Sequence, residues 1–390
     1  MKISQAVNVD DVRKLAKRRL PRICYDFIEG GVEDEQALER NHEAFRRHAL
    51  LPRYLVDVSK RNQSTRIFGR DYASPFGISP AGMLDLFRPG TDQFLAEAAA
   101  AANIPCVCST ASGPSIERLH NIAPNNVWMQ IGGSRDQAIT ADMVRRARDL
   151  GLETLVLTVD VRVMPRRERN LRNGFGRPFR LRWDVLLEAM THPAWIIDYP
   201  RFGGLPVMGN WVPYAANGAD ADGVAAFYGT QTPTADQTWR VLEGIREPFP
   251  GNLVVKGILH PQDAMRATDL GADGLIVSNH GGRQLDRSPS PLEVFPAIRA
   301  AVGDRSTLML ESGVRRGSDV VIGLCLGAKL TFFGRPTAYG AAAAGRVGVD
   351  KVIEILRTEI DLVMAQIGGA DIASLGPHFL FRPDDRTNVT

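Results

Sequence analysis

The stretch "GLIVSNHGGRQLD", Gly274 to Asp286, joins a short apolar run to a histidine, two glycines and an arginine. A continuous apolar run of this length is typical of a parallel strand that is buried on both faces. His280 and Arg283 stand just beyond the end of that strand, where the glycines leave room around them. What they do there depends on how many other strands end in the same place.

Seven further apolar runs follow the same pattern after residue 70. They are "FGISPAG" (76–82), "PCVCST" (105–110), "VWMQIG" (127–132), "TLVLTVD" (154–160), "LVVKG" (253–257), "LMLESG" (308–313) and "LTFFGRP" (330–336). The stretches between them, such as "GTDQFLAEAAAAAN" and "PQDAMRATDLGA", have helical spacing and often end at glycine. Eight strand–helix units predict an α/β fold of the (β/α)₈ TIM-barrel class.

Segments outside the repeat complete the predicted organisation. We expect a single domain over 1–390, with the barrel at about 70–370. N-terminal helices are expected within 8–48, because "VDDVRKLAKRRLP" and "EDEQALERNHEAFRRHAL" read as two amphipathic helices that cover one barrel end. An irregular insertion, about 167–233, separates the fourth and fifth strands. A loop of that length is uncommon unless it is a lid, an interface or an anchor.

Composition excludes several classes of function. The net charge of +3 is too small to suggest nucleic acid as a partner. The N-terminus has charged residues where a signal peptide has its apolar core, and no apolar run approaches the roughly 20 residues that span a bilayer. The four cysteines have neither disulfide nor zinc spacing, and Cys106 and Cys108 read as small core residues. We therefore expect a cytoplasmic protein without a metal site.

Polar residues follow nearly every predicted strand. Because the carboxyl ends of barrel strands meet on one face, that face is the expected site. The residues brought there are Ser79 to Gly82, Ser109, Gln130, Thr158, Asp160, Lys256, His280, Arg283, Gly313, Arg315, Gly334 and Arg335. The loops "ESGVRRGSD" and "FFGRP" follow strands seven and eight, the usual phosphate site of such barrels. Their glycines and arginines predict a phosphorylated ligand, either substrate or cofactor.

Several of these motifs together resemble the FMN-dependent α-hydroxy acid dehydrogenase and oxidase family. They are "SNHGGRQLD", "ESGVRRGSD", "LTVD" with "RRER", "VVKG" and "LPRICYDFIEGGVEDE", and the resemblance extends from about residue 8 to 378. Within the family, "STAS" (109–112), "THPAW" (191–195) and "DIASLGPHFL" are similar to the mandelate-oxidising branch. The resemblance implies FMN as the cofactor and a homotetramer.

The resemblance also implies a role for each strand-end residue. The FMN phosphate is expected at Gly313, Arg315, Gly334 and Arg335. The flavin ring is expected at Pro80, Ala81, Gly82, Ser109, Gln130, Thr158, Lys256, Ser278 and Glu311. His280 is the implied general base, and Asp160 pairs with the imidazolium that forms. Lys256 stabilises the reduced, anionic flavin, and Arg283 with Arg167 holds the substrate carboxylate.

Three residues depart from the family pattern near the implied substrate. Phe27 and Gly132 each stand where family members usually have a tyrosine. Ala111 replaces an indole of the oxidases, although the mandelate branch shares this alanine. The departures indicate either a slow or inactive flavin-binding relative or a site reshaped for a larger substrate, and the second interpretation is favoured because the charged residues are all kept. The expected reaction is oxidation of an (S)-2-hydroxy acid, aromatic or bulky and mandelate-like, to the 2-oxo acid, with a larger non-mandelate hydroxy compound as the alternative.

Other functions remain open on the residues alone. Gly82, where many oxidases of the family have alanine, favours a quinone or another carrier over oxygen as the electron acceptor. A phosphate-binding isomerase or aldolase with Lys256 as a Schiff-base nucleophile is a different class. A non-catalytic flavin-binding or membrane-docking module is a third.

The first part of the insertion combines basic and aromatic side chains. The segment is "RPFRLRWDVLLEAMTHPAWIIDYPRF" (177–202), and such a mixture suits a membrane interface. The mandelate branch uses the equivalent segment for membrane association. The segment 177–210 is therefore interpreted as a peripheral contact with the inner face of the membrane, with a lid or a subunit contact as the alternatives.

Overall fold

The computed structural model describes residues 1–175 and 183–381, and its centre is a closed barrel of eight parallel strands. The strand order around the barrel is β10-β11-β4-β5-β6-β7-β8-β9. The strands are β4 (Phe76–Ile78), β5 (Cys106–Cys108), β6 (Val127–Ile131), β7 (Thr154–Thr158), β8 (Asn252–Ile258), β9 (Gly274–Val277), β10 (Thr307–Glu311) and β11 (Leu330–Phe333). Each predicted apolar run overlaps one of them, so the prediction of a (β/α)₈ barrel is confirmed.

Alternating strand residues fill the barrel and its surroundings. Val107, Val156 and Ile276 belong to a buried cluster inside the barrel, whereas their neighbours pack outward against the helices. A hairpin that the sequence pattern did not indicate, β2 (Thr65–Ile67) with β3 (Arg70–Tyr72), contributes Ile67 and Tyr72 to the inner cluster. The indole of Trp128 donates a hydrogen bond to the Tyr72 hydroxyl at 3.2 Å. The hairpin therefore closes the end of the barrel opposite the carboxyl ends of the strands.

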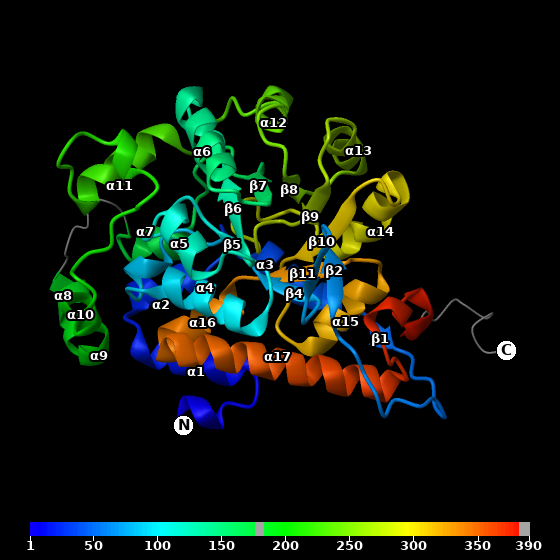
Figure 1. Ribbon diagram of the computed structural model, residues 1–390. Coiled ribbons are helices and arrows are strands. Elements are labelled where there is room, and N and C mark those ends of the chain that lie inside the picture. Colours follow the sequence, from blue (N-terminus) through cyan, green and yellow to red (C-terminus); the bar gives the residue numbers. More distant parts are fainter. Residues whose placement is uncertain (176–182, 382–390) are drawn as a thin grey trace.

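Helices form the outer layer of the barrel (Figure 1). They are α4 (Thr91–Ala102), α5 (Ile116–Ile122), α6 (Gln137–Asp149), α12 (Trp239–Arg246), α13 (Pro261–Asp269), α14 (Pro291–Val302), α15 (Gly317–Cys325), α16 (Arg335–Ala344) and α17 (Arg346–Ile367). Short strands β1 (Ala49–Leu50) and β12 (Leu380–Phe381) pair the two ends of the chain. Outside the insertion, the described residues also form the single 3₁₀ turns η1 (Ile3–Gln5), η2 (Leu84–Leu86), η4 (Ile372–Ser374) and η5 (Pro377–Phe379).

The N-terminal segment has three helices where the sequence predicted two. They are α1 (Val9–Arg19), α2 (Arg22–Glu29) and α3 (Gln36–Arg46). Helix α1 packs on the side of the barrel against α16 and α17, whereas the end of α2 and helix α3 lie over the strand ends. The additional helix arises because Pro21 ends α1 and is well placed to precede a new first turn.

The insertion is largely helical rather than irregular. Its elements are α7 (Glu168–Arg172), α8 (Trp183–Met190), α9 (Pro193–Ile196), α10 (Asp198–Arg201), η3 (Val212–Tyr214) and α11 (Ala221–Gln231). Figure 1 shows α8, α9 and α10 grouped at one edge of the molecule, away from the β2–β3 hairpin. Among the described residues, no helix is long and apolar enough to cross a membrane.

A buried pair of amides joins α3 to the loop that carries His280. The Asn41 side chain donates to Asn279 Oδ1 at 2.9 Å, and Asn279 donates back to Asn41 Oδ1 at 2.8 Å. Asn279 also accepts from the Gly282 amide at 3.1 Å. Since both side chains are buried, the pair fixes the loop to the N-terminal segment.

We expect Asn41→Ala to lower the free energy of unfolding by about 1–3 kcal/mol, because one hydrogen-bonding partner of the buried Asn279 amide is lost. Urea unfolding measures the change. Asn121→Ala, on the exposed side of α5, is the matched control and should change stability by no more than about 0.5 kcal/mol. Equal unfolding midpoints for the two variants would show that the amide pair does not hold the loop.

Candidate active site

A cavity of about 280 Å³ lies at the carboxyl ends of the barrel strands, and all eight strands or their following loops contribute to its wall. The predicted site residues that line it are Phe27, Pro80, Ala81, Gly82, Ser109, Ala111, Gln130, Gly132, Thr158, Arg167, Lys256, His280, Arg283, Glu311, Gly313, Arg315, Gly334 and Arg335. Two predicted residues, Asp160 and Ser278, do not line the cavity. They lie directly behind it, bonded to residues that do.

His280 and Asp160 form a hydrogen-bonded pair. The Nδ1 atom of His280 is 3.0 Å from Asp160 Oδ1, which fixes Nδ1 as the protonated nitrogen and leaves Nε2 as the available base. His280 has a left-handed backbone, with φ +58°, a conformation that is typical of functional sites in non-glycine residues. Gly257 makes room for the pair, because a Cβ on its backbone at φ +107° would lie 2.6 Å from Asp160 Cγ.

Electrostatics keep the pair in the state that a general base needs. Burial lowers the pKa of His280, and the charge of Lys256 lowers it further, although Asp160 opposes both. Burial alone would raise the pKa of Asp160, but its interaction with His280 and the charge of Lys256 hold it below its ordinary value. The imidazole is therefore neutral and the carboxylate ionised at neutral pH.

Lys256 is held in a buried ion pair. Its Nζ is 2.7 Å from Glu311 Oε2 and 3.4 Å from Ser278 Oγ. Burial lowers the pKa of Lys256, but Glu311 and Asp160 together raise it above its ordinary value. A Schiff-base lysine must be neutral to attack a carbonyl. The ion pair therefore argues against the aldolase alternative and leaves a fixed positive charge at the cavity.

Arg283 and Arg167 have no carboxylate partner in the part of the chain that the structure describes. Arg283 Nη1 donates to the carbonyls of Phe27 and Gly30 at 2.6 and 2.8 Å. Burial, together with the repulsion of neighbouring arginines, holds the pKa of Arg283 well below its ordinary value and lowers that of Arg167 to about 10. Both side chains are half-buried and line the cavity, so the two guanidinium groups can take an anion from outside the chain.

Phe27 supports these arginines instead of contributing a hydroxyl. Its ring centroid is 4.8 Å from Arg283 Cζ and 6.0 Å from Arg167 Cζ. Its other contacts are the rings of Phe87 and Phe175, with centroids at 4.6 and 4.9 Å. The ring thus offers the guanidinium groups a cation–π surface within an aromatic cluster.

In the predicted phosphate loops, the backbone passes close to the backbone of a neighbouring segment. Gly313 has φ +87°, and a Cβ there would lie 2.7 Å from the Asn41 carbonyl oxygen. Helix α15 begins beside it, and Asp319 caps this end by accepting from the amides of Arg315 and Arg316. The Arg335 side chain differs from expectation, because it donates to the carbonyls of Ile28, Gly30 and Gly281. Two of its five N–H groups thereby fasten the N-terminal segment, a third bonds the loop after β9, and two are left for a ligand.

The insertion supplies part of the wall that the sequence analysis missed. Trp211, Tyr228, Thr232, Pro233 and Gln237 all border the cavity. They follow no strand and have no periodic signal, so only the length of the insertion indicated their importance. In contrast, 183–202 contributes nothing to the cavity wall. The lid interpretation of that segment stays a prediction, and Arg177, Arg180 and Arg182 lie outside the described residues.

Comparisons with known proteins agree with this geometry. A family described as "FMN-dependent dehydrogenase" matches residues 16–382. The (S)-mandelate dehydrogenase of Pseudomonas putida is 42% identical over 373 residues, which are 96% of this chain and 93% of that protein. The L-lactate dehydrogenase of Caulobacter vibrioides is 38% identical and covers 95% of this chain and 96% of its own. A solved structure of the monotopic membrane protein (S)-mandelate dehydrogenase has a TM-score of 0.92 at 41% identity, and covers 97% of this chain and 99% of that one.

FMN fits the residues at the strand ends. The glycine and arginine loops around Gly313 and Gly334 suit its phosphate. Thr158 Oγ1 is buried at the cavity and has no hydrogen-bond partner among the described residues, as expected of a group that bonds a polar ring edge. Lys256 supplies a positive charge where a reduced flavin carries negative charge.

We expect Lys256→Met to reduce stability by about 3–5 kcal/mol, because Glu311 is then buried without its counter-charge. Burial raises the pKa of Glu311, but pairing with Lys256 holds it below 4.5. The pair therefore stabilises the wild-type protein above pH 4.5, and this contribution is lost as the pH falls through the lowered pKa. The stability difference between variant and wild type should shrink at acid pH, as measured by urea unfolding with saturating FMN.

The double variant Lys256→Met/Glu311→Gln is the control, because it removes both charges and should regain much of the loss. A pH-independent difference, or no recovery in the double variant, would show that the ion pair is not the cause.

Proposed function

Because this chain belongs to the FMN-dependent dehydrogenase family and is an FMN-dependent oxidoreductase that acts on 2-hydroxy acids, we propose that its substrate is an (S)-2-hydroxy acid with an aromatic or bulky side chain. The observation that carries the proposal is the His280–Asp160 pair beside two half-buried arginines, Arg283 and Arg167, that have no carboxylate partner among the described residues. A base next to an anion site suits a substrate that presents a carboxylate and an oxidisable carbon together.

Proton removal is assigned to His280. Its Nε2 is the free nitrogen, and it takes a proton from the α-hydroxy carbon centre of the substrate. Asp160, bonded to Nδ1 at 3.0 Å, stabilises the imidazolium that forms. The low pKa of the free imidazole keeps it available as a base before the substrate arrives.

Substrate orientation is assigned to Arg283 and Arg167. Arg283 is fixed by two carbonyls of the N-terminal segment and by the Phe27 ring. It therefore presents its remaining N–H groups to a carboxylate without losing much side-chain entropy. The anion in turn neutralises the mutual repulsion of the two arginines.

The cofactor residues are assigned as the sequence predicted. Gly313, Arg315, Gly334 and Arg335 hold the phosphate, and Pro80, Ala81, Gly82, Ser109, Gln130, Thr158, Lys256, Ser278 and Glu311 hold or support the ring. When bound, FMN accepts the two electrons of the oxidation and passes them on. A Cβ at Gly82 would lie 3.0 Å from the Cβ of Ala111, so the cavity wall has little free space between these two residues. A membrane quinone is the proposed acceptor.

The preference for a bulky substrate follows from the unfilled volume of the cavity beside Ala111 and Gly132. Ala111 is small, and a Cβ at Gly132 would meet no atom within 4 Å. A small acid such as glycolate leaves this volume unfilled, and unfilled apolar space contributes no binding. The (S)-mandelate dehydrogenase relative supports the same preference.

Anaerobic mixing with a panel of acids tests the proposal through the flavin absorbance. We expect (S)-mandelate to bleach the flavin at least about 10-fold more efficiently than glycolate or L-lactate, because a buried aromatic ring contributes about 1.5–3 kcal/mol. His280→Gln should keep its FMN and reduce it about 10²–10⁴-fold more slowly. Faster reduction by glycolate would exclude the aromatic preference, and near-normal reduction in His280→Gln would exclude the base assignment.

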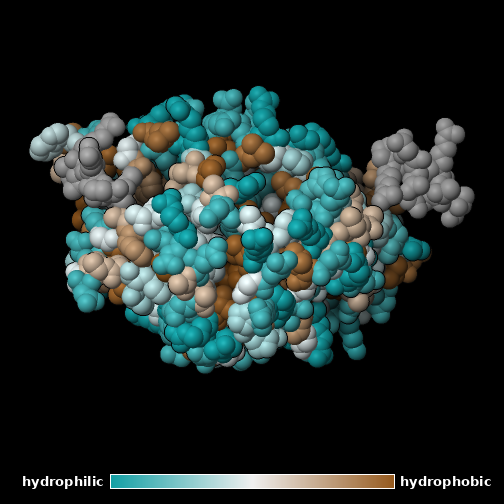
Figure 2. All heavy atoms as spheres, turned by 90° about the horizontal axis from the view of Figure 1, so that it is seen from above, coloured by the Kyte–Doolittle hydropathy of each residue, from teal (hydrophilic) through white to brown (hydrophobic). Residues whose placement is uncertain are grey.

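We further propose that α8, α9 and α10 attach the enzyme to a membrane surface. The exposed large apolar side chains of this region are Trp183, Leu187, Met190, Ile196, Ile197, Phe202 and Leu205. Figure 2 shows a different face, on which hydrophilic residues dominate and hydrophobic ones are dispersed. The related structure described as a monotopic membrane protein supports this assignment.

The opposite side of these helices is fastened to the barrel. Trp195 Nε1 donates to the Phe87 carbonyl at 2.8 Å, and the Tyr199 hydroxyl donates to the Leu86 carbonyl. Asp198 is buried and pairs with Arg19 at 2.6 Å. The apolar side chains therefore face outward on a firmly held support.

Co-sedimentation with vesicles that contain anionic lipid tests the attachment. We expect the wild-type enzyme to pellet and the variant Trp183→Ser/Leu187→Ser/Met190→Ser to stay in the supernatant, with at least a 10-fold weaker partitioning from the lost apolar contact of about 1.5–3 kcal/mol per residue. Leu362→Ser, at an exposed position of α17, is the control and should pellet. The wild type, the triple variant and the control could instead partition alike between vesicles and supernatant. If light scattering then shows that the triple variant has lost the expected homotetramer, the apolar surface is a subunit contact.

A further inference from the structure

A buried asparagine of the insertion connects two stretches of the cavity wall. Asn210 is only 1% exposed and is not itself part of that wall. The next residue, Trp211, lines the cavity, and so do Ser109 to Ala111 at the end of β5. Since Asn210 and Thr110 are 100 residues apart in the chain, the separation of the two stretches depends on contacts between the segments that carry them.

The side-chain amide of Asn210 lies between hydrogen-bond donors and hydrogen-bond acceptors. Its Oδ1 accepts from the Ile116 amide at 2.9 Å and from Arg146 Nη2 at 3.4 Å. Its Nδ2 donates to the Thr110 carbonyl at 3.5 Å and to Ser112 Oγ at 3.4 Å. The Ser112 hydroxyl gives its own proton to a nearby carbonyl, so its oxygen is left to accept. Asparagine suits this position because its amide has both an acceptor oxygen and N–H donors.

These contacts hold both ends of the loop after β5, residues 109–115. Thr110 lies at its start, and Ile116 begins α5, whose own N-cap residue makes no side-chain hydrogen bond to the helix. Gly209 adds a backbone bond, because its amide donates to the Gly113 carbonyl at 2.9 Å. A Cβ at Gly209 would lie 2.8 Å from the same carbonyl oxygen. The insertion therefore lies in direct contact with the loop.

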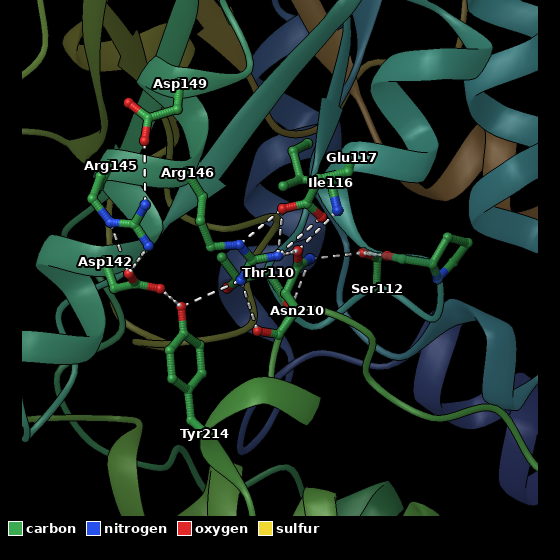
Figure 3. Close-up of polar contacts among 11 residues, drawn as sticks. Thr110, Ser112, Ile116, Glu117, Asp142, Arg145, Arg146, Asp149, Asn210 and Tyr214 are labelled. Atoms are coloured by element: carbon green, nitrogen blue, oxygen red, sulfur yellow. Dashed lines mark hydrogen bonds and ion pairs between the residues drawn. The ribbon is translucent and has the colours of Figure 1, made fainter.

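Helix α6 fixes Asn210 from another side. Arg146 Nη1 donates to the main-chain carbonyl of Asn210 at 3.2 Å, and Arg146 is itself held by both carboxylate oxygens of Glu117. Tyr214 extends the network, because its hydroxyl donates to Asp142 at 2.6 Å. In Figure 3 the contacts from α5, α6 and the loop after β5 meet at Asn210. Its side chain is therefore held in one position relative to three elements of the barrel.

We propose that Asn210 is a positioning residue, which sets the separation of Ala111 from Trp211 and thereby the fit of the substrate's aromatic side chain. The inference rests on the proposed function, in which the cavity beside Ala111 receives that side chain. Asn210 acts through its neighbours, since it does not reach the cavity. Its loss leaves the buried Ile116 amide and Thr110 carbonyl without this partner, and the loop is then free to shift. His280 follows a different strand, so proton removal should be unaffected.

Anaerobic flavin reduction by the FMN-bound enzyme tests the proposal with (S)-mandelate and L-lactate. The limiting rate and the half-saturating concentration are measured for each acid. We expect Asn210→Ala to raise the half-saturating concentration of mandelate at least about 5-fold and that of lactate less than about 2-fold, with both limiting rates within about 2-fold of wild type, because a contact far from the reacting carbon is equal in the ground state and the transition state. FMN should stay bound.

Two further variants separate positioning from loss of stability. Tyr214→Phe removes the bonds to Asp142 and Arg146 but none of those made by Asn210, so it should keep the wild-type ratio of the two half-saturating concentrations. Asn210→Asp keeps the acceptor for the Ile116 amide and loses the donor for Thr110. It should therefore unfold at a higher urea concentration than Asn210→Ala and yet show the same change of ratio. Asn210→Asp also carries the test where Asn210→Ala does not fold.

An unchanged ratio in Asn210→Ala or Asn210→Asp would overturn the assignment of Asn210 as a positioning residue. An equal change of ratio in Tyr214→Phe would also overturn it, because the effect would then come from a weaker network and not from the amide. Both results are read against a wild type that prefers mandelate. A wild-type enzyme that is half-saturated by lactate at a lower concentration than by mandelate would instead overturn the proposed aromatic preference.

Discussion

Two half-buried guanidinium groups hold the N-terminal segment on the barrel, and the rest of the site depends on this attachment. Arg283 and Arg335, from different strand ends, donate to the carbonyls of Phe27, Ile28 and Gly30. The same contacts place the Phe27 ring under Arg283 and close one side of the cavity. One set of hydrogen bonds therefore fastens the N-terminal segment and also fixes the two guanidinium groups for which we propose roles in binding the substrate and the cofactor phosphate. The unpaired positive charge is tolerated because the ligands that enter are anions.

The insertion after the fourth strand has two parts with different partners. The first part, 183–202, bonds to the barrel through Trp195, Asp198 and Tyr199 and presents apolar side chains outward. The second part, from Met208 to Gln237, packs on α5 and α6 and forms a wall of the cavity. The length of the insertion suggested a single lid, interface or anchor. The structure instead divides it into one part that presents apolar side chains outward and one part that lines the cavity.

The eight strands were predictable because each one is a local apolar run, and the site residues were predictable because parallel strands bring their ends together. His280 and Asp160, 120 residues apart, are bonded for this reason. The β2–β3 hairpin, the bond of Arg335 to the N-terminal carbonyls, and the position of Trp211 were not predictable. Each depends on contacts between distant segments that leave no period in the sequence. Helix α2 was missed because its eight residues are too short for a reliable pattern.

The two parts of the insertion are joined by the short segment 203–207, which includes two glycines with positive φ. The outer helices bond to the barrel at the carbonyls of Leu86 and Phe87, whereas the second part bonds to α5 and α6 through Asn210 and Tyr214. A mutation in one part of the insertion is therefore expected to have little effect on the structure of the other part. In evolution, an enzyme of this build could gain or lose its attachment to lipid while its choice of acid stayed the same, and it could change that choice without leaving its place in the cell.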